Sequence, residues 1–304
     1  MGTGPEGGMS ELYHLGDGRL AVSVSSTGAE LMSLTDAAGR EWLWQGDPAS
    51  WARRAPMLFP VVGRCAGDAL RHRGRSYPMT QGHGYAPNRD FALLNKTSSG
   101  CTLRLDPDAT TRECYPFDMR LDVALSVTDG VLTQTAEVTN VGSEIGVASV
   151  GFHPGFQWPQ PTAPDRPQTD YIVRFERDEP APIRRIEGGR VTAATFSSEL
   201  AGRVLKLRPE LFPDAMVFDR IESRSVWFGV PGIPGVRAGF PDCPYLGLWM
   251  RPGARYLCIE PWQGFHCPEG FTGEIMEKPG MVRVQPGQSF RRTMVIAVDS
   301  PDPG

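Results

Sequence analysis

Residues 119–139, MRLDVALSVTDGVLTQTAEVT, decide the fold class of this chain. Over residues 119–127, apolar side chains alternate with polar or small ones, which is the period of a strand with one buried face. Thr128, Asp129 and Gly130 supply a turn, and residues 131–139 continue in an extended pattern. We therefore predict an antiparallel hairpin here, and it is the clearest pair of strands in the sequence.

Short apolar runs bounded by turn residues surround this hairpin on both sides. They predict strands within residues 20–24, 28–34, 41–44, 55–62, 148–158, 171–175, 204–207, 225–230, 246–249 and 257–259, and hairpins at 67–77 and 281–298. Residues 47–54 predict one short helical turn. The 35 glycines and 28 prolines favour many short strands joined by tight turns. The sum predicts an all-β protein, a large antiparallel β-sandwich.

The domain organisation follows from the lack of repeats or shifts in composition. We predict a single domain over residues 11–300. Residues 1–10 are rich in glycine and lack the basic and apolar regions of a signal peptide, so we expect a disordered terminus there.

Composition excludes several classes of partner. The net charge is -4 and no basic block occurs, so we expect neither nucleic acid nor an anionic membrane as a partner. The longest apolar runs are too short to span a bilayer. None of the 6 cysteines forms a CxxC pair, which argues against a zinc site and favours free thiols in a reducing cytoplasm.

Residues 256–264, YLCIEPWQG, place the carboxylate of Glu260 in apolar surroundings. We expect residues 257–259 to end a buried strand, with Pro261 stopping it. Burial without a cationic partner would raise the pKa of Glu260, which suits a group that takes up and returns protons. An isolated glutamate at such a position is more often a plain strand-end group, so its significance depends on other residues.

Four further polar residues stand out by their surroundings. Arg64 follows Gly63 after an apolar run, and His83 lies between two glycines in the aperiodic loop 79–91. His153 precedes a proline, which favours an extended backbone, and Asp214 lies in the apolar stretch 210–218. Taken singly, each is more often structural than functional. His14 and His72 read as surface residues.

Five segments occur in a fixed order along residues 28–298. They are GAELMSL, APMLFPVVGR, GFHPGFQWP, CIEPWQG and EKPG. Together they resemble the aldose 1-epimerase (galactose mutarotase-like) family, and in particular its LacX-like branch. The resemblance implies a β-supersandwich with an open cleft on one sheet face and an isomerase activity in carbohydrate metabolism. It implies a small-molecule sugar as the partner and needs no metal or organic cofactor.

The resemblance also implies roles for individual residues. Glu260 matches the base that removes the proton from the anomeric hydroxyl, and His153 matches the acid that protonates the ring oxygen. The ring opens, the C1–C2 bond rotates, and closure gives the other anomer. The residues implied in sugar binding are His83, Arg64, Asp214 (with Asp219 and Asp242 as open alternatives), Trp262 and, less specifically, Trp158. His266, after the Glu260 turn, is a weaker candidate for the border of the cleft.

The loop QGHGYAPN at residues 81–88 departs from the family pattern QHGFAR. One glycine is inserted before His83, and Pro87 replaces an arginine that helps to hold the phosphate in relatives acting on hexose 6-phosphates. Arg89 is the nearest substitute, and Arg53, Arg54 and Arg71 are further cations without a motif. We therefore expect a mutarotase of a free aldohexose, as a monomer or weak homodimer. A hexose-6-phosphate mutarotase and a non-catalytic carbohydrate-binding protein are the alternatives, and the presence of both an acid and a base argues against the latter.

Overall fold

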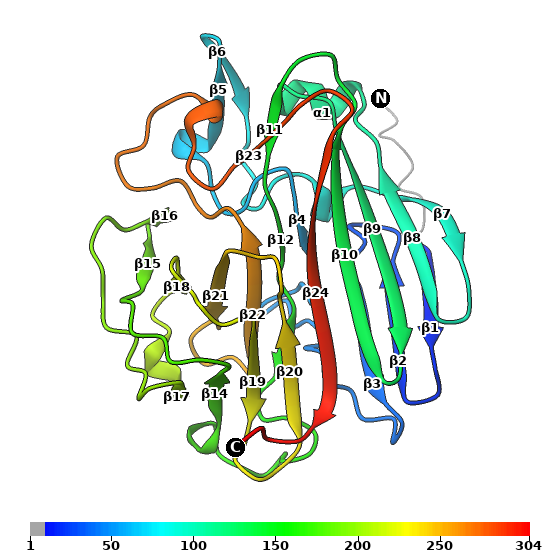
Figure 1. The fold of residues 1–304 in the computed structure, drawn as a ribbon, viewed down its shortest axis with the longest axis vertical. Coiled ribbons are helices and arrows are strands. Elements are labelled where there is room, and N and C mark those ends of the chain that lie inside the picture. Colours follow the sequence, from blue (N-terminus) through cyan, green and yellow to red (C-terminus); the bar gives the residue numbers. More distant parts are fainter. Residues whose placement is uncertain (1–9) are drawn as a thin grey trace.

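The protein is represented by a computed structural model, which describes residues 10–304. It is built almost wholly of antiparallel strands, as Figure 1 shows, and this confirms the predicted all-β sandwich class. Residues 1–9 of the predicted disordered terminus lie outside the described residues, while the Ser10 hydroxyl oxygen lies 2.6 Å from that of Ser25. In the part of the chain that is described, no helix combines the length and apolarity needed to cross a membrane.

Two large sheets make up the sandwich. The nine-stranded sheet has, in spatial order, β17 (Val204–Lys206), β14 (Ile172–Phe175), β19 (Ser225–Gly229), β20 (Gly235–Gly239), β24 (Ser289–Ser300), β10 (Val131–Asn140), β9 (Met119–Thr128), β8 (Gly100–Leu105) and β7 (Ala92–Lys96). The eight-stranded sheet has β16 (Arg190–Val191), β15 (Arg184–Glu187), β18 (Met216–Phe218), β21 (Tyr245–Trp249), β22 (Tyr256–Gln263), β12 (Val150–Phe152) and β4 (Met57–Leu58), with β13 (Gly155–Gln157) also pairing to β22.

Smaller elements complete the fold. They are the sheet β1 (Leu12–Gly16), β2 (Leu20–Ser25) and β3 (Leu31–Asp36), the pair β11 (Gly146–Ala148) and β23 (Val282–Val284), the hairpin β5 (Ala69–His72) and β6 (Arg75–Pro78), and the helix α1 (Ala109–Cys114). Short 3-10 turns lie at Ala66–Asp68, Ala86–Asn88, Gln168–Asp170, Pro209–Leu211 and Ile275–Glu277.

The predicted central hairpin is confirmed. β9 and β10 pair from Thr128 opposite Val131 to Met119 opposite Asn140, and the alternate apolar side chains of β9 are buried. These side chains belong to one continuous hydrophobic core that also contains apolar residues of β21, β22 and β24. The inner faces of the two large sheets therefore share a core, as expected for a sandwich.

Two predictions about strand boundaries are wrong. Pro261 does not end its strand, because β22 continues to Gln263 with Pro261 opposite Leu246. On the other side of β22, the pairing is interrupted between β12 and β13. The proline has no N–H, and its absence therefore costs no hydrogen bond between strands at this position. The same interruption splits the strand that we predicted over residues 148–158.

The predicted hairpin at residues 281–298 is also wrong. β23 pairs with β11, whereas β24 lies between β10 and β20, as Figure 1 shows. Asn140 marks the crossing between these sheets, because its Nδ2 donates to the carbonyl of Val284 and its carbonyl accepts from Gly287. Alternating sequence is compatible with any antiparallel partner, so the pattern could not select the right one.

Residues 47–54 form a tight turn in place of the predicted helical turn. Asp47 pairs with Trp51 in an isolated bridge, and the Asp47 carboxylate accepts a hydrogen bond from the Ala49 N–H. An aspartate that bonds its own backbone in this way stabilises a turn and competes with a helix.

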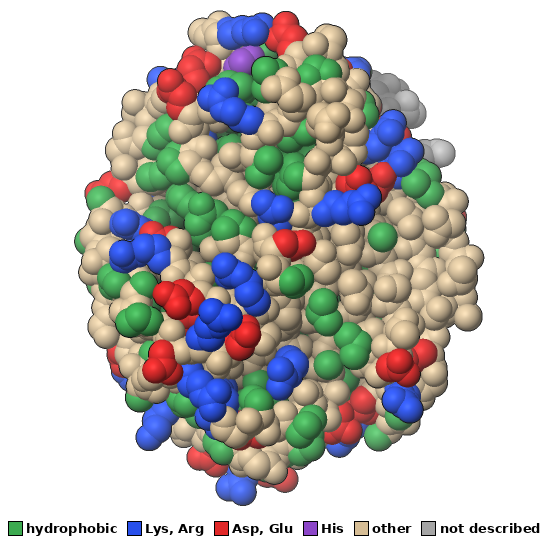
Figure 2. Space-filling model, viewed as in Figure 1, with side chains coloured by type: hydrophobic (Ala, Val, Ile, Leu, Met, Phe, Trp, Pro, Cys, Tyr) green, Lys and Arg blue, Asp and Glu red, His purple; other side chains and the backbone are tan. Residues whose placement is uncertain are grey.

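The visible surface carries mixed charge. Figure 2 shows Lys and Arg side chains interleaved with Asp and Glu over this face, without a continuous stripe of either sign. This face therefore offers no track for a nucleic acid backbone.

Candidate active site

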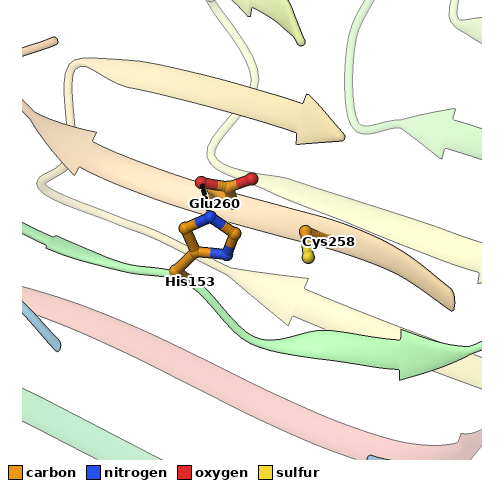
Figure 3. Close-up of side chains that lie close together, drawn as sticks. All are labelled: His153, Cys258 and Glu260. Carbon is orange, nitrogen blue, oxygen red and sulfur yellow. Dashed lines mark ion pairs between the residues drawn. The ribbon is translucent and has the colours of Figure 1, made fainter. Parts of the chain in front are cut away.

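Glu260 and His153 meet on the eight-stranded sheet. β12 ends opposite Trp262 and β13 begins opposite Cys258, so the break between these strands lies beside Glu260. His153 occupies that break and, as Figure 3 shows, points toward the Glu260 carboxylate, with the Cys258 side chain on the same strand as Glu260. The distance from His153 Nε2 to Glu260 Oε2 is 3.1 Å.

Both members of this pair are buried, with exposed fractions of 7% for His153 and 1% for Glu260. Burial lowers the pKa of His153 to about 3 and raises the pKa of Glu260 well above its ordinary value. Both shifts have the same physical cause, since each charged form loses its hydration. The resting pair is therefore favoured in its neutral form, with one proton held between carboxyl and imidazole.

A cleft of about 420 Å³ opens over this pair. Its volume suits a ligand the size of a monosaccharide. The wall combines aromatic faces with polar groups, among them Trp51, Trp249, Trp262, His83, His153, His266, Gln81, Asn88, Arg53, Asp214 and Glu260. Aromatic rings also hold His153 in place, with the ring centroids of Trp51 and Trp249 at 5.0 and 5.7 Å from that of the imidazole.

His83 reaches the cleft despite the inserted glycine. Its backbone is left-handed, with φ of 69°, and the Gly63 N–H donates to its Nδ1 at 3.2 Å. The proton of the neutral ring is then on Nε2, which leaves a hydrogen-bond donor for a ligand. Burial lowers the pKa of His83 well below its ordinary value, so the ring is neutral.

His266 belongs to the same wall. Its ring meets that of His83 edge to face at 5.5 Å, and His83 in turn meets His153 at 5.3 Å. The Arg64 N–H donates to His266 Nδ1 at 3.2 Å. The fit is close, because a Cβ on Gly63 would come within 2.2 Å of the His266 ring.

Of the three candidate aspartates, the structure brings Asp214 to the cleft. Its Oδ1 is buried and receives no hydrogen bond from the described residues, and Arg185 Nη1 is 3.7 Å away. Burial raises the pKa of Asp214. Asp219 instead pairs with Arg184 at 2.6 Å beside a neighbouring cavity, and Asp242 accepts a hydrogen bond from the Thr293 N–H.

Two predicted cations do not line the cleft. The side chain of Arg64 packs beside Gly82 and Gly189, at the edge of the cleft. Arg89 faces a different cavity, where it lies 4.0 Å from Asp108 and close to the ring of Tyr85. Of the two tryptophans, Trp262 lines the cleft, whereas Trp158 is core and packs against Phe212 and Phe228.

Comparison with known proteins identifies the family. The family model described as Aldose 1-epimerase matches residues 11–198. The chain belongs to the aldose 1-epimerase family. It is 28% identical to the LacX protein of Lactococcus lactis subsp. lactis over 290 residues, covering 92% of this chain and 96% of that relative. The predicted family and its LacX-like branch are thus confirmed.

Solved structures agree with this family assignment. A galactose mutarotase related enzyme from Lactobacillus acidophilus superposes with a TM-score of 0.86 at 26% identity, covering 96% of this chain and 99% of that one. A galactose mutarotase-like protein from Lactobacillus casei superposes with a TM-score of 0.87, also at 26% identity, covering 95% and 100%. The predicted mutarotase-like fold is therefore confirmed.

In this epimerase-family chain, sequence reasoning missed the role of Arg53 in the cleft wall. Arg53 Nη1 lies 3.1 Å from Glu30 Oε2 and 3.0 Å from the Pro87 carbonyl, and Nη2 donates to Asn88 Oδ1. Asn88 also donates to Gln81, so Arg53 and Glu30 form one polar network with residues of the loop that departs from the family pattern. One signal in the sequence could have indicated this role. Glu30 lies within an apolar segment, and a buried carboxylate requires a cationic or hydrogen-bonding partner.

One group of residues has metal-ligating side chains close together. Donor atoms of His153, Cys258 and Glu260 lie within 4.8 Å of one another. Burial raises the pKa of the Cys258 thiol well above its ordinary value, which opposes the thiolate that a cation requires. The set therefore suits proton transfer between Glu260 and His153 better than it suits a metal ion.

Proposed function

We propose that this protein is an aldose 1-epimerase that interconverts the α and β anomers of a free aldohexose. The single observation that carries the proposal is the His153–Glu260 pair, 3.1 Å apart at the base of a sugar-sized cleft. Anomer exchange requires one proton to leave the anomeric hydroxyl and another to reach the ring oxygen, and both oxygens are bonded to C1. A base and an acid in direct contact can serve two such neighbouring atoms.

The direction of proton transfer follows from the roles proposed for the pair. In the reactive form, Glu260 is ionised and His153 is protonated, which requires only that the shared proton move to the imidazole. Glu260 then takes the proton from the anomeric hydroxyl while His153 gives its proton to the ring oxygen. Once the C1–C2 bond has rotated, the reverse transfers close the ring on the other face. Each proton transfer contributes roughly 10²–10⁴-fold.

The contact also constrains how the sugar binds. No sugar atom fits between groups that are within hydrogen-bonding distance of each other. The hemiacetal must therefore approach both groups from the open side of the cleft, with C1 above the pair. The ring of Trp51 or Trp249 would then pack against the apolar face of the pyranose, and Asp214 and His83 would bind its hydroxyls.

A free sugar is favoured over a sugar phosphate by the charges of the wall. Among the described residues that line the cleft, Arg53 is the one arginine or lysine, and its positive charge is already paired with Glu30. Asp214 adds negative charge, and the histidines are neutral because burial lowers their pKa. Within the wall itself a phosphate dianion would meet no unpaired arginine or lysine among the described residues, and Arg64 lies only at the edge of the cleft.

Exchange spectroscopy tests the proposal. NMR exchange rates between α and β anomers are measured for glucose, galactose and their 6-phosphates, with the purified protein at catalytic concentration. We expect saturable acceleration for a free hexose and a lower kcat/KM for the phosphate esters. A much higher kcat/KM for a 6-phosphate would establish the hexose-6-phosphate alternative. Sugar binding without any acceleration would instead indicate a carbohydrate-binding protein.

A further inference from the structure

A second cavity, of about 570 Å³, lies next to the sugar cleft along the chain. The two hollows share one segment, because His266 lines the cleft and the next residue, Cys267, lines the cavity. Five charged side chains line this cavity, namely Arg71, Arg190, Glu187, Glu269 and Lys278. This cavity has no part in the proposed epimerase reaction.

Lys278 lies at this cavity and is 3% exposed. Its Nζ donates to the carbonyl of Phe265 at 2.5 Å, and no carboxylate of the described residues lies within salt-bridge distance of it. A buried ammonium is costly without an anionic partner. Burial lowers the pKa of Lys278, and the thiols of Cys65 and Cys267 oppose that shift and so favour its charged form.

Cys65 and Cys267 are neighbours in space, both less than 4% exposed and both free thiols. They belong to one hydrophobic cluster, and their segments are linked where the Cys267 N–H donates to the Arg64 carbonyl at 3.0 Å, which brings residues 65 and 267 side by side. Cys267 is the member of the pair that lines the cavity.

The surroundings of Cys267 favour its thiolate. The neighbouring Cys65 thiol is the main cause that lowers the pKa of Cys267 to about 6; burial acts against this shift, and Lys278 and Arg190 act with it. The same contact raises the pKa of Cys65, and Asp68 adds to that shift. Reactive cysteines are found in electropositive sites that a reagent can reach, and the cavity that Cys267 lines provides that access.

We propose that Cys267 and Cys65 form a reactive dithiol that hydrogen peroxide or a small organic hydroperoxide, entering through the 570 Å³ cavity, converts to an intramolecular disulfide. The Cys267 thiolate attacks the O–O bond, which gives a sulfenic acid and releases hydroxide or alkoxide. The Cys65 thiol then attacks the sulfenic sulfur, forming the S–S bond and releasing water. The peroxide is reduced by two electrons and the two thiols are oxidised.

The disulfide would join the segments that carry Arg64 and His266. These segments already meet through the Arg64 N–H and His266 Nδ1, and both border the cleft. Oxidation would thus fix one wall of the sugar site covalently. The thiol chemistry does not depend on the sugar reaction.

The order in which thiols react provides the test. The full chain is treated with equimolar hydrogen peroxide at about pH 7 and analysed by intact mass and peptide mapping. We expect loss of two hydrogen atoms and a linked Cys65–Cys267 peptide pair. Cys267→Ser should abolish the reaction, and Cys65→Ser should stop at the gain of one oxygen. Cys114→Ser is the matched control, because Cys114 is the most exposed of the six cysteines, and it should leave the disulfide unchanged.

Alkylation by iodoacetamide gives an independent readout. The rate at Cys267 should reach half its plateau near the pKa of about 6, and Lys278→Met should move that midpoint up by about one unit or more. Faster labelling of Cys114 than of Cys267, or a midpoint near the ordinary value of about 8.5, would overturn the proposal. So would a peroxide-treated protein without the linked peptides.

Discussion

Nε2 of His153 lies 3.1 Å from Oε2 of Glu260, and the residues around the His153–Pro154 step explain why. A Cβ at Gly151 would come 2.8 Å from the ring of Trp262, and one at Gly155 would come 2.9 Å from the ring of Trp51. Glycines on both sides of the step therefore let Trp262 and Trp51 pack directly against this segment, and Trp51 also contacts the imidazole, with ring centroids 5.0 Å apart. The segment GFHPGF thus specifies the aromatic surroundings of the pair as well as the histidine itself.

His153→Gln should lower kcat by roughly 10²–10⁴-fold, because glutamine keeps a polar side chain but cannot deliver a proton to the ring oxygen. KM should change little, since binding uses other parts of the wall. The measurement is the NMR exchange rate as a function of sugar concentration. His14→Gln, at an exposed position of β1, is the control and should behave like the wild type. Equal losses in both variants would contradict the role of His153.

Asp214→Asn should raise KM about tenfold or more, because the hydrogen bond of a sugar hydroxyl to a carboxylate is stronger than one to an amide. Asp219→Asn is the matched control, since its carboxylate pairs with Arg184 outside the cleft. Steady-state kinetics on both variants distinguish the aspartates that the sequence left open. A larger increase of KM in Asp219→Asn would show that Asp214 is not the sugar ligand.

Gly63→Ala should destabilise the protein more than Gly67→Ala does. Both glycines have positive φ, at 75° and 61°, which costs alanine about 1–2 kcal/mol. A Cβ at Gly63 would also lie 2.2 Å from the His266 ring, whereas one at Gly67 meets nothing within 4 Å. Denaturant unfolding measures the difference. Equal free energies of unfolding in the two variants would mean that His266 is not held against Gly63.

Glu260→Gln should stabilise the fold at neutral and alkaline pH. Since burial raises the pKa of Glu260 in the folded state, the native protein binds this proton more tightly than the unfolded chain does. The stability contributed by Glu260 is then present below about pH 4.3 and is lost as pH rises toward the folded-state pKa. The variant should therefore have a higher Tm than wild type at about pH 8 and a similar Tm at about pH 4. A lower Tm at pH 8 would contradict this.

The sequence predicted the parts of the fold that depend on local periodicity. Residues 119–139 gave the right hairpin, because alternation and turn chemistry act over short distances, although Thr128 pairs with Val131 and so belongs to the strand and not to the predicted turn. Which strands pair with each other depends on residues far apart in the sequence. The alternation pattern therefore could not predict the pairing of β23 with β11. Pro261 was misjudged for the same reason. A proline is tolerated inside this strand because the neighbouring strand is interrupted beside it, and the sequence does not reveal that interruption.

The candidate site divides in the same way. His153, His83, Glu260 and Asp214 came from motifs and lie together in the cleft. Arg64 also came from a motif, as the last residue of APMLFPVVGR, and Arg89 was chosen as the nearest cation to the altered loop. Both lie outside the wall, because the direction of a long side chain depends on tertiary packing. Arg53 reaches the cleft through its pairing with Glu30, which belongs to a different segment of the chain.

Binding and exchange in Glu260→Gln test most directly whether Glu260 is the base. Sugar affinity is measured by calorimetry and anomer exchange by NMR, on the same preparation and with the same free hexose. We expect affinity close to wild type with catalysed exchange reduced by roughly 10²-fold or more. Exchange at the wild-type rate in a variant that still binds sugar would show that Glu260 is not the base.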